Sequence, residues 1–247
     1  SVNTNDADFN IKSSTNEKGR VKVFRDVDIV GISSEEEFDI VIEEDKGNVY
    51  ITEKRKRDNN YSIGYKSIEY KIDIEIPKGV KLYLSEDDGD VIIEGLDADV
   101  QLNMEDGDIN INDFTGPELS IKSEDGDIGL VNCSGKAILE MEDGDLEAIK
   151  CNFTSVTLEM EDGDIELETN LFDNGQYNIE SEDGDILFKL SGNGALINLK
   201  TDDGNIKSSG NLEMISKEEG KQSLQFGNKG ANVNIETEDG TIEVKLM

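Results

Sequence analysis

A short Asp-Gly turn recurs along most of this chain at nearly constant intervals. The turn glycines are Gly89, Gly107, Gly126, Gly144, Gly163, Gly184, Gly204 and Gly240. The steps between them are 18 to 21 residues, except for a last step of 36. A period near 20 residues is typical of solenoids, in which each repeat buries its apolar face only by stacking on its neighbours.

Apolar and polar residues alternate on both sides of each turn. Around Gly144, for example, Ala137 and Leu139 precede the turn, and Leu146 and Ala148 follow it. This period of two predicts β-strands with one buried face. An Asp-Gly turn also suits an antiparallel hairpin, but the pattern returns by translation, which favours parallel stacking. The sequence therefore predicts an all-β fold, a single-chain parallel β-solenoid of about nine rungs, each rung being one repeat of two strands.

The repeat argues for one solenoid domain over residues 1–247. Residues 1–35 are expected to form an N-terminal segment or cap, residues 53–80 an insertion, and residues 82–247 the regular rungs. The longer final interval predicts a protruding hairpin near residues 211–227.

The chain is strongly acidic, with a formal net charge of -33. Such a surface repels nucleic acid and anionic membranes, so we exclude nucleic acid as a partner. No stretch is long and apolar enough to predict a transmembrane segment.

Carboxylates flank nearly every turn glycine and account for 22 of the 57 acidic residues. Stacked about 5 Å apart, two of them repel by roughly 1 kcal/mol in water. One interpretation is that solvent and mobile counterions screen the charges. The other is a row of sites for calcium or another divalent cation, which prefers carboxylate oxygens. The candidate ligands are Asp106, Asp108, Asp125, Asp127, Asp143, Asp145, Asp162, Asp164, Asp183 and Asp185.

The only two cysteines, Cys133 and Cys151, each follow a turn glycine by seven residues. They should therefore lie on adjacent rungs. We favour two small side chains that fill a core column. A disulfide is the alternative in an oxidising compartment, because neighbouring rungs bring the Cα atoms within bridging range.

One basic cluster stands out in this acidic chain, and aromatic residues follow it. It consists of Lys54, Arg55, Lys56, Arg57, Tyr61 and Tyr65. Most such runs are solvated loops. The alternative is a binding patch that docks on acidic side chains or stacks on sugars.

Catalysis has little support in the sequence. The chain has no His, which excludes His-dependent triads and the zinc-protease motif. Paired carboxylates hydrolyse glycosides in some enzymes, but here they recur in every repeat, as turn chemistry does. We predict no catalytic residues, no enzyme activity and no required cofactor.

The run Ile74-Glu75-Ile76-Pro77-Lys78-Gly79-Val80, followed by repeated Gly-Asp-Ile or Gly-Asp-Val, resembles a bacterial family of adhesin-like β-strand-repeat proteins. The similarity covers roughly residues 36–247. It implies a right-handed β-helix, export to the periplasm or cell surface, and no established enzyme activity. The start at Ser1 without an initiator Met fits a removed N-terminal signal, through which the protein is expected to be anchored.

The leading functional hypothesis is a non-catalytic, exported or surface β-solenoid that acts as an adhesin-like binding module for a glycan or a cell-surface protein. The alternatives are a β-helix polysaccharide-processing enzyme and a calcium-binding structural stalk.

Overall fold

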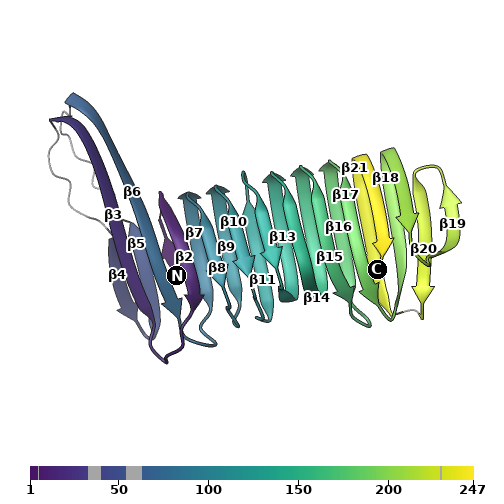
Figure 1. Cartoon of the computed structure of the whole chain (residues 1–247), viewed down its shortest axis with the longest axis horizontal. Coiled ribbons are helices and arrows are strands. Elements are labelled where there is room, and N and C mark those ends of the chain that lie inside the picture. Colours follow the sequence, from purple (N-terminus) through teal and green to yellow (C-terminus); the bar gives the residue numbers. More distant parts are fainter. Residues whose placement is uncertain (5, 33–39, 54–62, 229) are drawn as a thin grey trace.

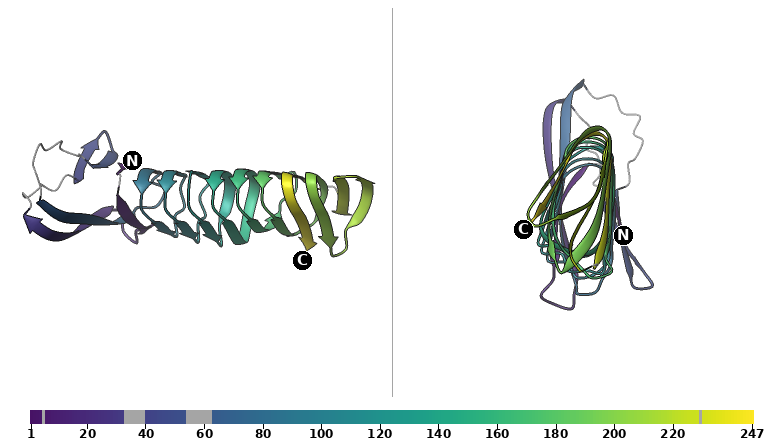
Figure 2. Two further views of the ribbon diagram at one scale, coloured as in Figure 1. Left: turned by 90° about the horizontal axis from the view of Figure 1, so that it is seen from above. Right: turned by 90° about the vertical axis from the view of Figure 1, so that its right-hand side faces the viewer.

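The structure is a computed structural model that describes residues 1–4, 6–32, 40–53, 63–228 and 230–247. It is an elongated all-β molecule whose strands stack along one axis (Figure 1). Seen along that axis, the stack has a flattened cross-section (Figure 2). The predicted all-β class is confirmed. Within the described residues, no helix could cross a membrane.

Each repeat contributes one strand to each of two stacks. The first stack holds the strands that precede the turn glycines, and the second stack holds those that follow them. In the first stack these are β7 (Leu82–Asp88), β9 (Val100–Asp106), β11 (Glu118–Ser123), β13 (Ser134–Asp143), the second half of β14 (Leu146–Asp162) and β16 (Gln176–Asp183). In the second stack they are β8 (Val91–Glu94), β10 (Ile109–Asn112), β12 (Ile128–Val131), the first half of β14, β15 (Ile165–Leu171) and β17 (Ile186–Gly192).

Neighbouring strands of these repeats pair in parallel, in the register that the aligned turns predict. Leu84 pairs with Leu102 in the first stack, and Ile93 pairs with Ile111 in the second. Side chains of one kind therefore lie above one another along the axis.

The inward-facing side chains of the two stacks form one continuous apolar core. Burying a large aliphatic or aromatic side chain stabilises the fold by about 1.5–3 kcal/mol. Tyr177 is fully buried, and its hydroxyl donates a 2.7 Å hydrogen bond to the Phe153 carbonyl oxygen. The phenol therefore lies in the core without an unpaired polar atom.

The turns require glycine for two independent reasons. Gly107 and Gly144 both have a φ of 116°, in the left-handed region that side chains disfavour. A Cβ added at Gly144 would also lie 2.3 Å from the carbonyl oxygen of Gly126 in the neighbouring repeat. The glycine column thus lets successive turns approach closely.

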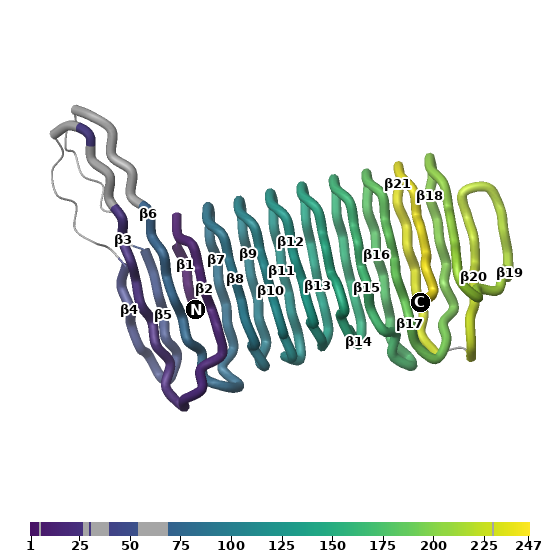
Figure 3. Tube along the Cα trace, viewed as in Figure 1, coloured from purple at the N-terminus to yellow at the C-terminus, as the bar shows by residue number. Residues whose placement is uncertain are grey.

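Residues 1–13 lie inside the stack, which corrects this part of the prediction that residues 1–35 form an N-terminal segment or cap. β1 (Val2–Asn3) pairs in parallel with β5 (Asn48–Glu53) and β7. β2 (Ala7–Ser13) pairs in parallel with β6 (Ile63–Ile76) and β8. Figure 3 shows this purple segment between β6 and β7.

The described part of residues 53–80 is also part of the stack rather than an insertion. β6 extends the second stack, and β5 extends the first. Beyond them, β3 (Arg20–Ile32) pairs antiparallel with β6, and β4 (Ile40–Asp45) pairs antiparallel with β5. The N-terminal end of the molecule therefore consists of two antiparallel strand pairs.

The C-terminal repeats lie out of sequence order, which corrects the prediction of regular rungs through residue 247. β21 (Ala231–Leu246) lies between the β16–β17 repeat and β18 (Gly194–Ser209). Figure 3 shows the yellow β21 in this position. The predicted hairpin is made of β19 (Glu213–Glu218) and β20 (Lys221–Gly227). β20 pairs antiparallel with β18, so the hairpin closes this end of the first stack instead of protruding.

Candidate functional site

The aspartates that follow the turn glycines form a hydrogen-bonded column. In each, one carboxylate oxygen accepts a hydrogen bond from the backbone N–H of the residue stacked next to it. Asp127 Oδ1, for example, accepts from the Asp145 N–H at 2.9 Å, and Asp145 Oδ1 accepts from the Asp164 N–H at 2.9 Å. The column runs through Asp8, Asp90, Asp108, Asp127, Asp145, Asp164 and Asp185 and ends at the N–H of Thr241. These carboxylates therefore join neighbouring repeats.

The aspartates that precede the glycines are exposed and lie close to one another. Partial desolvation raises the pKa of Asp106 above its usual value, and a hydrogen bond with Asp125 and the charges of Asp125 and Asp88 add to this effect. The surroundings of Asp106 thus disfavour its ionised form.

The predicted cation ligands lie along this edge, at the expected one-repeat spacing. Among the residues that the structure describes, no group of three or more His, Cys, Asp or Glu side chains is arranged to hold a metal ion. One oxygen of each post-glycine aspartate named as a ligand already accepts a backbone N–H. Cation binding by Asp106, Asp108 and the other candidates stays a prediction.

Cys133 and Cys151 are both buried free thiols on neighbouring repeats. The Asn152 N–H donates to the Cys133 carbonyl oxygen at 2.8 Å, which places the two residues side by side. A hydrogen bond with Cys133, together with burial, raises the pKa of the Cys151 thiol. Their oxidation to a disulfide stays a prediction.

The predicted basic and aromatic patch falls largely outside the described part of the chain. This applies to Lys54, Arg55, Lys56, Arg57 and Tyr61. Tyr65 belongs to β6, where its backbone pairs with Val30 of β3. The patch stays a prediction, and of its residues the structure places only the backbone of Tyr65, at the N-terminal end of the molecule.

A large apolar hollow opens at that same end, between the β4–β5 pair and the β3–β6 pair. Its volume is about 1010 Å³, and we call it the N-terminal hollow. Its lining comes from strands far apart in sequence and includes Val2, Val21, Ile42, Val49, Tyr50, Ile51, Ile74, Ile76, Val80, Leu82 and Tyr83. No sequence motif marks this site, because its lining depends on where residues 1–13 enter the stack.

Several apolar side chains of the N-terminal hollow face solvent. Ile42 is 50% exposed, Val80 is 50% exposed and Tyr83 is 47% exposed. Burial of such groups by a ligand is favourable at about 25 cal/mol per Å² of apolar area.

The charged groups beside this hollow have partners within the chain. The Arg20 guanidinium lies 3.9 Å from the Glu75 carboxylate, and the Lys81 ammonium lies 2.5 Å from the Asp99 carboxylate. The Ser1 ammonium donates a 2.7 Å hydrogen bond to the Val49 carbonyl oxygen. The site is therefore suited to an apolar ligand rather than to a small ion.

One buried carboxyl group links β7, which contributes to the lining of the hollow, to the first residues of the chain. Glu86 is 1% exposed and accepts a 2.8 Å hydrogen bond from the Ala7 N–H. The Thr4 hydroxyl donates to its other oxygen. Burial raises the pKa of Glu86 to about 8, the charges of Glu53, Asp87 and Asp6 also raise it, and the Ala7 hydrogen bond opposes them.

Glu86 occupies a core position that Met104 holds on the neighbouring strand. In the sequence, Glu86 is recognisable as the one acidic residue in a column that otherwise holds Met, Ser and Thr. This column lies outside the glycine and the regular apolar columns that define the repeat, so Glu86 is not part of the repeat pattern.

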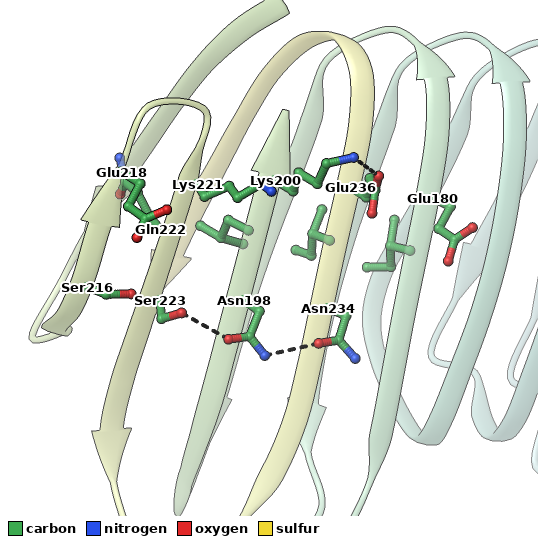
Figure 4. A pocket seen from close by; sticks show the side chains of 13 residues that line it. Glu180, Asn198, Lys200, Ser216, Glu218, Lys221, Gln222, Ser223, Asn234 and Glu236 are labelled. Carbon is green, nitrogen blue, oxygen red and sulfur yellow. Dashed lines mark hydrogen bonds and ion pairs between the residues drawn. The ribbon is translucent and has the colours of Figure 1, made fainter. Parts of the chain in front are cut away.

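A second, polar hollow of about 440 Å³ lies near the C-terminal hairpin (Figure 4). Ser223 donates to Asn198 at 3.0 Å, and the Asn198 amide donates to Asn234 at 3.1 Å. Lys200 forms an ion pair with Glu236. Because these polar groups bind one another, we favour the N-terminal hollow as the functional site.

A family model described as Toastrack DUF4097 matches residues 1–245 of the chain. Comparison with curated proteins gives no match.

Two solved structures are similar to the chain. One is a protein of Bacteroides fragilis, provisionally described as an adhesin, with 14% sequence identity and a TM-score of 0.50 over 98% of this chain and 90% of that one. The other is a protein of Clostridium sporogenes, provisionally described as a cell adhesion protein, with 14% identity and a TM-score of 0.31 over 100% of this chain and 92% of that one. At this identity, the first likeness concerns the fold alone.

Proposed function

The chain belongs to the family described as Toastrack DUF4097, and from this premise we propose that it is a non-catalytic, adhesin-like interaction module, exported or displayed at the cell surface. Its partner binds at the N-terminal hollow. The acidic remainder of the stack acts as a spacer that carries this end. The description of the Bacteroides fragilis protein as an adhesin agrees with the proposal.

The N-terminal hollow is the observation that carries this proposal. It combines about 1010 Å³ of space with exposed Ile42, Val80 and Tyr83. Apolar hollows of this kind are the usual binding sites of proteins. Exposed apolar groups gathered at one place on a charged surface also mark interaction sites.

The distribution of charge also favours a binding site at the N-terminal end of the molecule. Residues 1–81 hold 14 of the 24 Lys and Arg and 17 of the 57 Asp and Glu. The rest of the chain therefore has 10 cationic against 40 acidic side chains. Long-range repulsion keeps acidic partners away from the acidic part and leaves the nearly balanced end accessible.

The proposal includes the finer architecture. We take the two stacks as one right-handed parallel β-solenoid of about nine rungs, of the adhesin-like β-strand-repeat kind. The parallel register of successive repeats supports this architecture. It gives the binding end a rigid, extended support.

The experiment is to apply fluorescently labelled protein to intact bacterial and host cells, to a glycan array and to immobilised extracellular proteins. Tyr83→Lys places a charge at the hollow and should abolish retention on the surface that binds the wild type. Phe172→Lys is the matched control, because Phe172 is 40% exposed on a turn outside the hollow. Equal retention of both variants, or no retention of the wild type anywhere, would refute the proposal.

A further inference from the structure

We infer that the N-terminal hollow accepts an extended polypeptide strand of a partner protein, which pairs with the free edge of β4 and places alternate apolar side chains in the hollow. This inference rests on the proposed function and names the class of partner. Strand addition to a sheet edge uses backbone hydrogen bonds for affinity and side-chain pockets for specificity.

β4 has one free edge. β4 pairs with β5 along its whole length, from Ile40 opposite Glu53 to Asp45 opposite Asn48. No other described strand pairs with it. Its second edge thus presents backbone N–H and C=O groups that another strand can pair with.

The free edge of β4 lies beside the N-terminal hollow. Ile42 of β4 lines the N-terminal hollow and is 50% exposed. Side chains of an added strand point alternately to its two faces, so every second one would face the hollow. Backbone pairing and apolar burial are therefore available to the same ligand.

The other end of the first stack is covered by a strand of the chain itself. There β20 of the chain itself pairs antiparallel with β18 and buries Leu224 and Phe226, which are 1% and 8% exposed. The outermost strand, β19, has a register irregularity between Met214 and Ser216. Such bulges discourage further pairing. The hairpin therefore covers the C-terminal edge of the first stack, whereas β4 borders an open hollow.

The charge of β4 indicates the chemistry of the partner. Glu44 is exposed, and so is Asp45, whose carboxylate lies 3.9 Å from the Lys46 ammonium. Opposite charges on neighbouring strands are favourable, so the partner strand carries Lys or Arg beside this segment. A second copy of a chain with a net charge of -33 is disfavoured as the partner by overall repulsion.

The test uses a peptide copying β20, Lys221–Gly227, because this strand closes the opposite end of the same stack and begins with Lys. The peptide is acetylated, amidated and labelled with fluorescein, and its binding to the full chain is measured by anisotropy. A second peptide is N-methylated at the residues copied from Ser223 and Leu224, which blocks both backbone edges but retains the side chains.

Saturable binding of the unmodified peptide is expected, with at least tenfold weaker binding of the methylated one. Ile42→Lys should also weaken binding at least tenfold. Ile92→Lys should not, since Ile92 is a 42% exposed side chain on β8 outside the hollow. Circular dichroism of both variants checks that they fold as the wild type does.

Three outcomes would overturn the inference: no binding to the wild type, equal binding of the methylated peptide, or a β4-dependent dimer in sedimentation velocity. The last outcome would make a second copy the occupant. If the peptide fails to bind while Tyr83→Lys still abolishes surface retention, strand addition is wrong and the proposed function stands.

Discussion

The backbone N–H of Ala7 donates a 2.8 Å hydrogen bond to the carboxyl group of Glu86, 79 positions further along the chain. The bond holds β2 against β7, and Val2 of the adjoining β1 lines the N-terminal hollow. This buried acid therefore adds to the strand pairing that holds the first residues of the chain at the proposed binding end.

Stability should fall with rising pH because of Glu86. Its pKa rises from an ordinary 4.5 to about 8 on folding, so between these values the folded protein holds one more proton than the unfolded chain. Its contribution is complete below about pH 4.5 and is lost as the pH rises to about 8, with a slope of about 1.4 kcal/mol per pH unit. Glu86→Gln should remove this slope in urea unfolding measured from pH 5 to pH 9.

The control for Glu86 is Glu159→Gln, which alters an exposed carboxylate on β14. It should retain the wild-type slope. A wild-type slope in Glu86→Gln would show that other carboxylates carry the pH dependence.

Replacing a turn glycine by alanine should destabilise the protein more than replacing a glycine that has open space around its Cα atom. Gly144 and Gly47 both have positive φ, at 116° and 84°, but only at Gly144 would a Cβ meet a neighbouring carbonyl oxygen, at 2.3 Å. Gly47→Ala should cost about 1–2 kcal/mol of unfolding free energy through its backbone conformation. Gly144→Ala should cost about 3 kcal/mol or more, since the clash adds to the strain. Chemical denaturation compares them, and equal losses would show that close stacking contributes nothing.

Replacing one member of the aspartate column should distinguish its hydrogen bond from its charge. Asp127→Ala removes the acceptor of the Asp145 N–H and should cost about 1 kcal/mol. Asp127→Asn keeps an oxygen acceptor and should stay within about 0.5 kcal/mol of the wild type. Hydrogen exchange at the Asp145 amide provides the second measurement. It should accelerate in the alanine variant only.

Divalent cations should stabilise the protein by screening rather than by specific coordination. Because post-glycine carboxylates such as Asp127 and Asp145 are bonded to backbone N–H groups, calcium and magnesium at equal ionic strength should raise the melting temperature equally. The reference sample contains chelator and sodium chloride. A rise specific to calcium, lost in Asp125→Asn with Asp127→Asn, would instead establish the predicted cation sites.

The two thiols should be unreactive in the folded protein. Cys133 and Cys151 are buried, and the thiolate is the reactive form of cysteine. A chromogenic disulfide reagent should label neither residue in buffer and both in denaturant. Fast labelling of the native protein would indicate that the core opens at these repeats.

The regular part of the fold was predictable because each repeat carries the same constraints. The turn glycines from Gly89 to Gly184 and the apolar residues around them give both the strands and their parallel register. Alternation decides which residues face inward. It does not decide the order in which repeats stack.

The arrangement of strands at the two ends of the stack was not predictable, because it depends on the stacking order of the repeats. Asp6-Ala7-Asp8 supplies a turn without the glycine that marks the others, so the repeat of residues 1–13 was not recognised. Ala7 is not among the residues with positive φ, which explains why a side chain is tolerated there. At the other end, Gly240 lies between Gly184 and Gly204 in space, a placement that no local pattern encodes.

The N-terminal hollow could not be predicted from the sequence either. Its lining brings Val2, Ile42, Ile76 and Tyr83 together from four separate strands or turns, and none belongs to a recognisable motif. The acidic edge was visible in the sequence because it repeats. The apolar hollow was not, because it arises where the repetition stops.

The strands nearest the two chain termini lie inside the stack, and this position affects how the molecule carries mechanical load. β1 and β2 are hydrogen-bonded on both sides, and so is β21 near the other terminus. A pull on either end of the chain meets two ladders at once, so the molecule cannot be peeled strand by strand from its tip. Tension is instead shared across the sheets, a property suited to a tether.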